Sequence, residues 1–104
     1  MGTHTATVRH GQDVELGGRL DARSAAQVRG MLHAAVLDGT GTLVVDMARV
    51  EFLDAVGLGV LMGTHRLAEA HGRALALRDC PPRIGRLLRA IRLHRVLTVT
   101  ESAA

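Results

Sequence analysis

The segment EFLDAVGLGVLMG, residues 51 to 63, decides the fold of this chain. It places Asp54 between a bulky apolar pair and an apolar run that three glycines interrupt. Asp is a preferred N-cap residue, because its side chain accepts hydrogen bonds from the free N–H groups of a first helical turn. We therefore predict a helix from about residue 55 to His71, with Asp54 bonded to the N–H of Val56 or Gly57.

The predicted helix has more apolar surface than one contact can cover. Four residues share the face that we expect to meet the core, namely Val60, Leu61, Thr64 and Ala68. Three apolar side chains fall partly outside that face, those of Val56, Leu58 and Met62. The first two turns are thus apolar nearly all round. Either the last helix of the chain or a partner protein would have to cover the second side.

The N-terminal part predicts a hairpin followed by a helix. The segment TATVRHGQDVELGG (5–18) alternates apolar and polar residues on both sides of Gly11-Gln12, which is typical of two short strands and a turn. The period then changes, and we expect a helix that Asp21 or Ser24 caps and that Asp38-Gly39 ends. Its buried face would carry Ala25, Val28, Leu32 and Ala35.

The rest of the chain alternates strands with helices. TLVVDM (42–47) is a continuous apolar run, which indicates a central strand covered on more than one side. ALALRD (74–79) and RVLTVT (95–100) read as further strands, and PPRIGRLLRAIRL (81–93) as a helix that starts with proline. The apolar stripe of this last helix would comprise Ile84, Leu87, Leu88 and Ile91.

This alternation implies parallel strands joined by helical crossovers. With 104 residues and 11.1 kDa, the chain is long enough for one modest core and too short for two. We therefore predict a single α/β domain over residues 1–104, with a mixed, largely parallel sheet of four or five strands and helices mainly on one face.

The composition limits the kinds of function. The chain has one Phe and no Trp or Tyr, so stacking of nucleobases on aromatic side chains is nearly excluded, and we expect no nucleic-acid partner. Residues 73–95 carry seven Arg against one Asp. Five of these arginines recur at every third position, which fits either a solvated helix face or an acidic partner: Arg83, Arg86, Arg89, Arg92 and Arg95.

Metals, cofactors and membranes are not expected either. The six His include no i, i+4 pair, and the single Cys80 reads as a small buried apolar residue. No stretch reaches membrane-spanning length and the first residues lack an apolar signal region, so we expect a cytoplasmic protein without membrane insertion.

The glycines do not form a nucleotide loop. The dinucleotide fingerprint needs Gly-x-Gly-x-x-Gly directly after a strand, but Met62 stands at its third glycine and the preceding strand is expected to end near Met47. We expect Asp46 to order the following segment MARVEF (47–52) as a loop through bonds to backbone N–H groups. No Ser or Cys lies in a recognisable nucleophile elbow, so an enzyme is not expected.

Three segments carry a resemblance to a known family. Residues 43–77, with the motif Asp-x-x-Gly-Leu-Gly at 54–59, look like the core of a STAS domain, the fold of bacterial anti-sigma factor antagonists. GGRLDARSA (17–25) resembles the strand-to-helix element of that family, and LHRVLTV (93–99) resembles its closing segment. The resemblance covers nearly the whole chain in the right order.

The resemblance implies a binding function and a switch. In such antagonists an anti-sigma factor with a histidine-kinase-like ATPase domain binds around the start of this helix, and phosphorylation of a serine there ends the interaction. Matching by position puts Asp54 on the Asp of the family motif, Gly57 on its Gly and Ala55 on the phosphorylated Ser. Val56 follows, so neither position has a hydroxyl and we expect no phosphorylation site there.

We therefore predict an antagonist-like binding module without the usual switch, regulated through its abundance or its partner. The alternative is a non-phosphorylated STAS adaptor subunit of another signalling or lipid-transport assembly, and weak homodimerisation is left open. The predicted partner surface consists of Asp54, Ala55, Val56, Gly57, Leu58, Gly59 and Met62.

Overall fold

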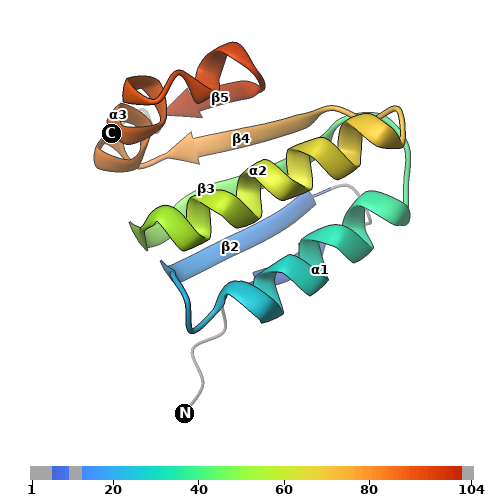
Figure 1. The fold of residues 1–104 in the computed structure, drawn as a ribbon, viewed down its shortest axis with the longest axis horizontal. Coiled ribbons are helices and arrows are strands. Elements are labelled where there is room, and N and C mark those ends of the chain that lie inside the picture. Colours follow the sequence, from blue (N-terminus) through green and yellow to red (C-terminus); the bar gives the residue numbers. More distant parts are fainter. Residues whose placement is uncertain (1–5, 10–12, 102–104) are drawn as a thin grey trace.

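The structure is a computed structural model that describes residues 6–9 and 13–101 (Figure 1). Its elements, in chain order, are β1 (Ala6–Arg9), β2 (Asp13–Leu20), α1 (Ala25–Leu37), β3 (Leu43–Leu53), α2 (Ala55–Ala70), β4 (Leu75–Cys80), α3 (Pro82–Ala90), the 3₁₀ helix η1 (Leu93–Arg95) and β5 (Thr98–Glu101). One sheet has the order β1-β2-β3-β4-β5, in which β1 is antiparallel to β2 and the other strands are parallel. The predicted α/β domain with a mixed, largely parallel sheet is confirmed. The expected hairpin turn at residues 11 and 12 lies outside the described residues.

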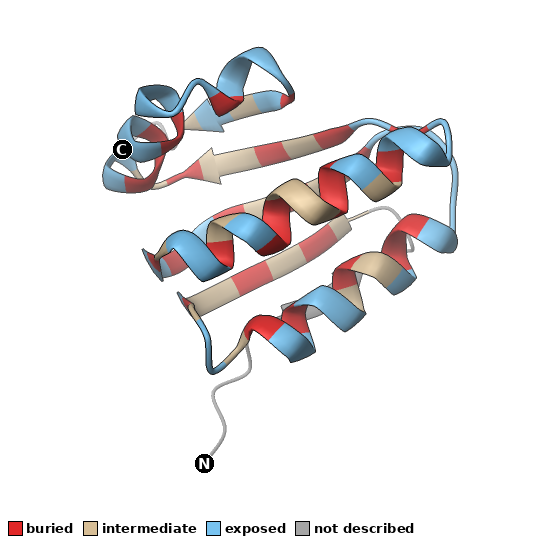
Figure 2. Cartoon of the chain, in the orientation of Figure 1, coloured by how far each residue is buried: buried red, intermediate tan, exposed pale blue. Residues whose placement is uncertain are grey.

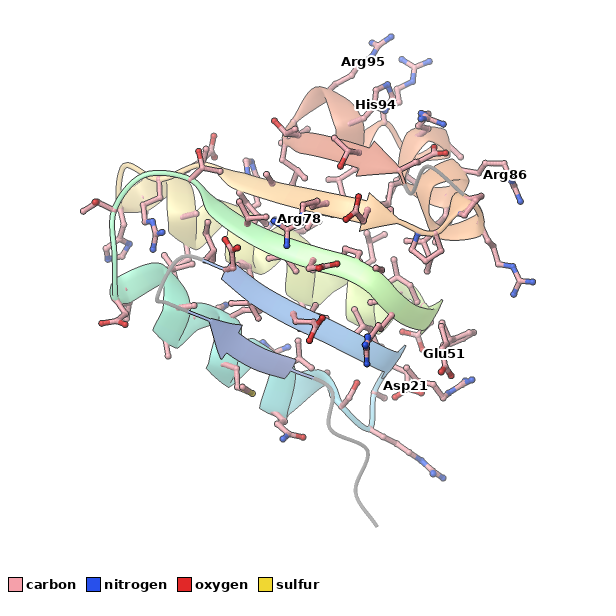
Figure 3. All side chains as sticks on the ribbon, turned by 180° about the vertical axis from the view of Figure 1, so that it is seen from behind. Asp21, Glu51, Arg78, Arg86, His94 and Arg95 are labelled. Atoms are coloured by element: carbon pink, nitrogen blue, oxygen red, sulfur yellow. The ribbon has the colours of Figure 1, made fainter. Side chains whose placement is uncertain are left out.

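The helices cover one face of the sheet, as predicted. Helices α1 and α2 lie side by side on this face, and buried and partly exposed residues alternate along the strands beneath them (Figure 2). In β3 the side chains of Leu43, Val45 and Met47 are fully buried on the helical side. Among the residues that the structure describes, the opposite face carries charged side chains and no helix (Figure 3). The expectation that residues 42–47 are covered on more than one side is therefore wrong.

Strand β3 is longer than its sequence pattern indicates. It continues to Leu53, through the segment that we expected to be a loop, and ends one residue before Asp54. Beyond Met47 its buried positions are Val50 and Leu53, spaced by three rather than two. Register irregularities in the pairing of β2 with β3 explain this spacing, because an extra residue shifts the face on which the following side chains lie. The expected bond from Asp46 to a backbone N–H does form, to Ala48 at 2.9 Å, but inside the strand.

Helix α1 has the predicted face, but its start lacks a side-chain capping bond. Its buried side includes the four expected residues, Ala25, Val28, Leu32 and Ala35. Ser24 occupies the N-cap position, as one of the two predicted alternatives, but its side chain makes no capping bond; its Oγ donates instead to the carbonyl oxygen of Arg19 at 2.7 Å. The carboxylate of Asp21 accepts from the N–H of Arg23 at 3.0 Å, which orders the loop before the helix.

The C-terminal end of α1 is held by a residue far along the chain. The guanidinium of Arg73, which is only 4% exposed, donates to two carbonyl oxygens of the last helical turn and to two of the following loop. A cation at this end also complements the helix dipole. The four acceptors are the carbonyl oxygens of Ala35, Val36, Thr40 and Gly41, at 2.8 to 3.3 Å.

The apolar stripe of the last helix differs from the prediction. Helix α3 begins at Pro82 and buries Ile84 and Leu88, as expected, but Leu87 and Ile91 are 38% and 44% exposed. The helix ends early, at Ala90, and Arg92 then adopts a left-handed conformation with φ 63°. Helix α3 lies over β4 and β5, whereas α1 packs against α2, so the last helix is not the cover of α2.

No helix within residues 6–9 and 13–101 is long and apolar enough to cross a membrane.

Candidate functional site

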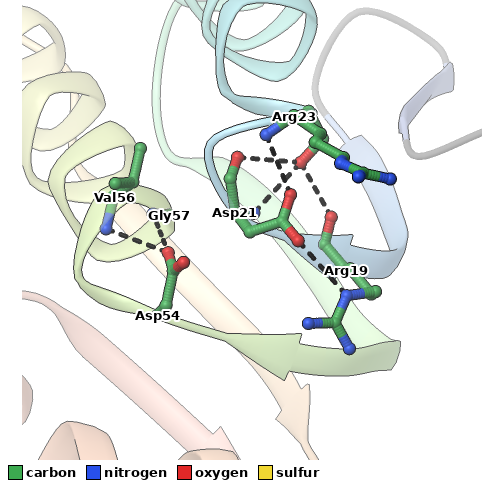
Figure 4. A network of polar contacts seen from close by, with 7 residues as sticks. Arg19, Asp21, Arg23, Asp54, Val56 and Gly57 are labelled. Carbon is green, nitrogen blue, oxygen red and sulfur yellow. Dashed lines mark hydrogen bonds and ion pairs between the residues drawn. The ribbon is translucent and has the colours of Figure 1, made fainter.

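The start of α2 lies at the edge of the sheet where β2 and β3 end, beside the loop that leads into α1 (Figure 4). The Oδ1 atom of Asp54 accepts hydrogen bonds from the N–H groups of Val56 at 2.9 Å and Gly57 at 3.0 Å. The backbone N–H of Asp54 donates to the carbonyl oxygen of Leu20 at the end of β2. The predicted N-cap is confirmed, and it joins α2 to both strands.

Gly57 fixes how closely α2 approaches the sheet. A Cβ atom at this position would lie 2.2 Å from the carbonyl oxygen of Leu20 and 2.8 Å from its carbonyl carbon. These are backbone atoms at the end of β2, so no side-chain movement can make room for a methyl group. Gly57 is buried, and it therefore supports the site rather than offering contact surface.

The other residues of the predicted partner surface are exposed to different degrees. Ala55, Val56 and Gly59 are exposed, and the Val56 side chain retains 44% of its accessible surface. Leu58 and Met62 are half-buried and pack against the core cluster. The outward surface is thus centred on Ala55, Val56 and Gly59, with the edges of Leu58 and Met62 beside it.

At two positions of α2, no contact within the monomer requires a glycine. A Cβ atom at Gly59 or at Gly63 would meet nothing within 4 Å. Glycine in a helix interior is less stable than alanine by roughly 0.5–1 kcal/mol. Ala55, Gly59 and Gly63 follow one another at intervals of four, so they line one side of the helix and leave its backbone open to close approach.

A polar and aromatic rim, which the sequence reasoning did not assign to the site, lies beside the start of α2. Asp21 pairs with the guanidinium of Arg19 at 3.2 Å (Figure 4). The same guanidinium lies 4.0 Å from the centre of the Phe52 ring. Desolvation raises the pKa of Asp21, but hydrogen bonds from Arg19 and from backbone N–H groups outweigh it and lower this pKa. The Gly-x-Leu-Asp element before α1 was the signal that could have placed Asp21 here.

The chemistry of the site is that of a contact surface. The side chain at Ala55 is a methyl group, and the hydroxyl of α2 belongs to Thr64, which is fully buried and donates to the Val60 carbonyl oxygen at 2.8 Å. Burial raises the pKa of the Cys80 thiol to about 12, which keeps it protonated. Within the described ranges, no group of three or more His, Cys, Asp or Glu could hold a metal ion.

The family comparison covers almost the entire chain. Residues 3–99 match the family model described as "Mlab, STAS domain". An anti-sigma-B factor antagonist of Staphylococcus aureus is 28% identical over 101 residues, which are 97% of this chain and 94% of that protein. Its counterpart in Staphylococcus epidermidis is also 28% identical, over 103 residues that cover 97% and 95% of the two chains.

Solved structures show the same fold. A crystal structure of an anti-sigma factor antagonist from Mycobacterium paratuberculosis is 26% identical with a TM-score of 0.74, and the match covers 97% of this chain and 86% of that one. The Bacillus cell fate determinant SpoIIAA in its phosphorylated form is 23% identical with a TM-score of 0.67, covering 92% and 89%. SpoIIAA in its unphosphorylated form is 21% identical with a TM-score of 0.68, covering 95% and 88%.

Proposed function

The chain belongs to the STAS domain family, and from this premise we propose that it is an anti-sigma factor antagonist, which regulates transcription by binding an anti-sigma factor through the exposed start of α2. The observation that carries this proposal is the surface of Ala55, Val56 and Gly59, which is exposed and largely apolar although the rest of this helix turn is fixed by Asp54 and Gly57. Its activity is then surface recognition rather than catalysis.

We further propose that this antagonist lacks a phosphorylation switch at this place, and that its partner is an anti-sigma factor of the histidine-kinase-like ATPase class. Ala55 occupies the position that the family resemblance gives to the phosphorylated serine. A phosphate there would add close to two negative charges beside Val56 and displace an apolar contact. Ala55 cannot accept a phosphate, and the buried Thr64 is bonded to its own helix, so neither supplies the switch.

The same residues give the second candidate function. An adaptor subunit of another signalling or lipid-transport assembly would need the exposed apolar surface but no serine. The methyl group of Ala55 and the isopropyl group of Val56 fit such a permanent contact equally well.

A binding experiment with purified partners separates these functions. Kinase-type anti-sigma factors from the genome of origin are each tested by calorimetry with the wild type, with Val56→Glu and with Leu37→Glu as the matched control. Both residues are exposed, at 44% and 61%, but Leu37 lies at the far end of α1. We expect Val56→Glu to weaken binding by about tenfold or more, which corresponds to about 1.4 kcal/mol, and Leu37→Glu to bind like the wild type.

The switch is tested with ATP and an Ala55→Ser variant. The wild type should stay bound and unmodified, while the variant becomes phosphorylated at Ser and released if the kinase accepts its surroundings. Release of the wild type with phosphate on another residue would contradict the missing switch. Absence of binding to every kinase-type anti-sigma factor would contradict the antagonist function and favour the adaptor.

A further inference from the structure

A cleft lies toward the opposite end of α2 from Asp54. It has a volume of about 390 Å³ and lies between the C-terminal half of α2 and η1, above the first residues of β4 and β5. His65 on its wall is eleven residues from Asp54, or roughly 16 Å along a helix. The cleft is lined by His65, Glu69, Arg73, Ala74, Leu75, His94, Arg95, Val96, Leu97 and Thr98.

The cleft carries more positive than negative charge. Arg95 and His94 are exposed on η1 (Figure 3), and their side chains make no hydrogen bond or ion pair within residues 6–9 and 13–101. The guanidinium of Arg73 donates its hydrogen bonds to backbone carbonyl oxygens. No carboxylate of the described residues therefore neutralises its charge. Glu69 is the single carboxylate among the lining residues. An anion is therefore favoured at the η1 side of the cleft.

His65 is the polar group on the α2 side, and it is incompletely satisfied. His65 is only 6% exposed, and its Nδ1 atom has no hydrogen-bond partner. Its Nε2 atom lies 3.5 Å from a carboxylate oxygen of Glu69. A charge-assisted hydrogen bond is normally 2.7–2.9 Å long. A buried polar atom without a partner is destabilising, by roughly 1–3 kcal/mol. Packing alone would favour an apolar residue at this position.

The remaining walls are aliphatic. Leu75 and Leu97 are buried beneath the cleft, and Val96 is 51% exposed at its edge. The lining residues include no Phe, Tyr or Trp. The volume lies within the roughly 300–1,000 Å³ of small-molecule sites. An exposed aliphatic edge formed by Val96 and Ala74, next to a cationic side, suits a small aliphatic molecule that has a charged end.

We propose that the cleft between α2 and η1 binds a small aliphatic molecule with one anionic group, a carboxylate or a phosphate. The anion lies beside Arg95 and His94, and the aliphatic part lies against Ala74 and Val96, above the buried Leu75 and Leu97. This site is independent of the partner surface at the start of α2.

Titration of the isotope-labelled protein, followed by NMR chemical shifts, tests the proposal. The probes are hexanoate and hexyl phosphate, with hexan-1-ol and inorganic phosphate as controls that each lack one half of the ligand. We expect saturable shifts at Leu75, His94 and Val96 with either or both amphiphilic anions, and much weaker binding of the two controls. Comparison of hexanoate with hexyl phosphate tells which anionic group is preferred.

Three variants make the test specific. Arg95→Gln should weaken binding about fivefold or more, equivalent to about 1 kcal/mol, and Val96→Asp should abolish it by placing a carboxylate at the exposed edge. Arg86→Gln is the matched control, because Arg86 is an exposed arginine on α3 outside the cleft (Figure 3). Equal weakening by Arg86→Gln, equal binding of hexan-1-ol, or the absence of saturable shifts would each overturn the proposal.

Discussion

The two sides of α2 use the same residue type for opposite reasons. On the side that faces the sheet, Gly57 lies against the backbone of Leu20, where no Cβ atom fits. On the outward side, Gly59 and Gly63 have free space around them. The first glycine is required by the fold. The other two glycines destabilise the helix, and no contact within the monomer requires them. Close contact with a partner would explain them.

The largest effect is expected for Gly57→Ala. The new methyl group would overlap the carbonyl of Leu20, so either α2 moves away from the sheet or the end of β2 shifts. We expect a loss of about 3 kcal/mol or more in the free energy of unfolding, because overpacking against backbone has no cheap relief. Urea denaturation followed by circular dichroism measures it.

Gly30→Ala is the matched control for this variant. Gly30 lies in α1, and a Cβ atom there meets nothing within 4 Å, so its replacement should stabilise the protein slightly. If Gly57→Ala were as stable as Gly30→Ala, the close approach of α2 to β2 would be wrong.

A smaller loss is expected for Asp54→Ala. The substitution removes the acceptor for the N–H groups of Val56 and Gly57 and should lower the free energy of unfolding by about 1 kcal/mol. Asp54→Ser keeps an N-cap acceptor and should recover most of this stability in the same denaturation assay. Equal losses in the two variants would show that the cap bonds are not the source of the effect.

The smallest change in stability, with the opposite sign, is expected for Gly59→Ala and Gly63→Ala. Each should raise the free energy of unfolding by roughly 0.5–1 kcal/mol, because alanine favours the helix and meets no obstacle. The same variants should bind the anti-sigma factor less tightly, as calorimetry can measure, whereas Gly30→Ala should gain stability without losing affinity. Unchanged binding by both α2 variants would show that the partner does not approach the outward glycines.

Features that depend on neighbours in the sequence could be predicted. Helix α2 and its cap are local, since Asp54 bonds to residues two and three positions later and the apolar period runs without a break. The buried face of α1 follows from the same periodicity. The family motif at residues 54–59 indicated where the site lies. The motif alone does not show which of these residues are exposed.

Features that depend on strand pairing or on helix ends could not be predicted. The bulged pairing of β2 with β3 spaces the buried residues Met47, Val50 and Leu53 by three, so a strand looks like a loop. The predicted apolar stripe of α3 ran from Ile84 to Ile91, but the helix ends at Ala90, so Ile91 lies beyond it, and Leu87 faces outward within it. The cleft beside η1 depends on the distance between two elements about thirty residues apart in the sequence. Hydrophobic periodicity carries no information on that distance.

The Arg73 clamp on α1 has a consequence for the order of folding. The hydrogen bonds of Arg73 join residues 32 to 38 positions apart, across all of β3 and α2. The carbonyl groups at the end of α1 are therefore capped by Arg73 only after α2 has packed beside α1, since contacts across long loops form late relative to local ones. In a stopped-flow experiment Arg73→Met should mainly speed unfolding, with a φ-value of about 0–0.3. A φ-value near 1 would mean instead that the clamp closes in the folding nucleus.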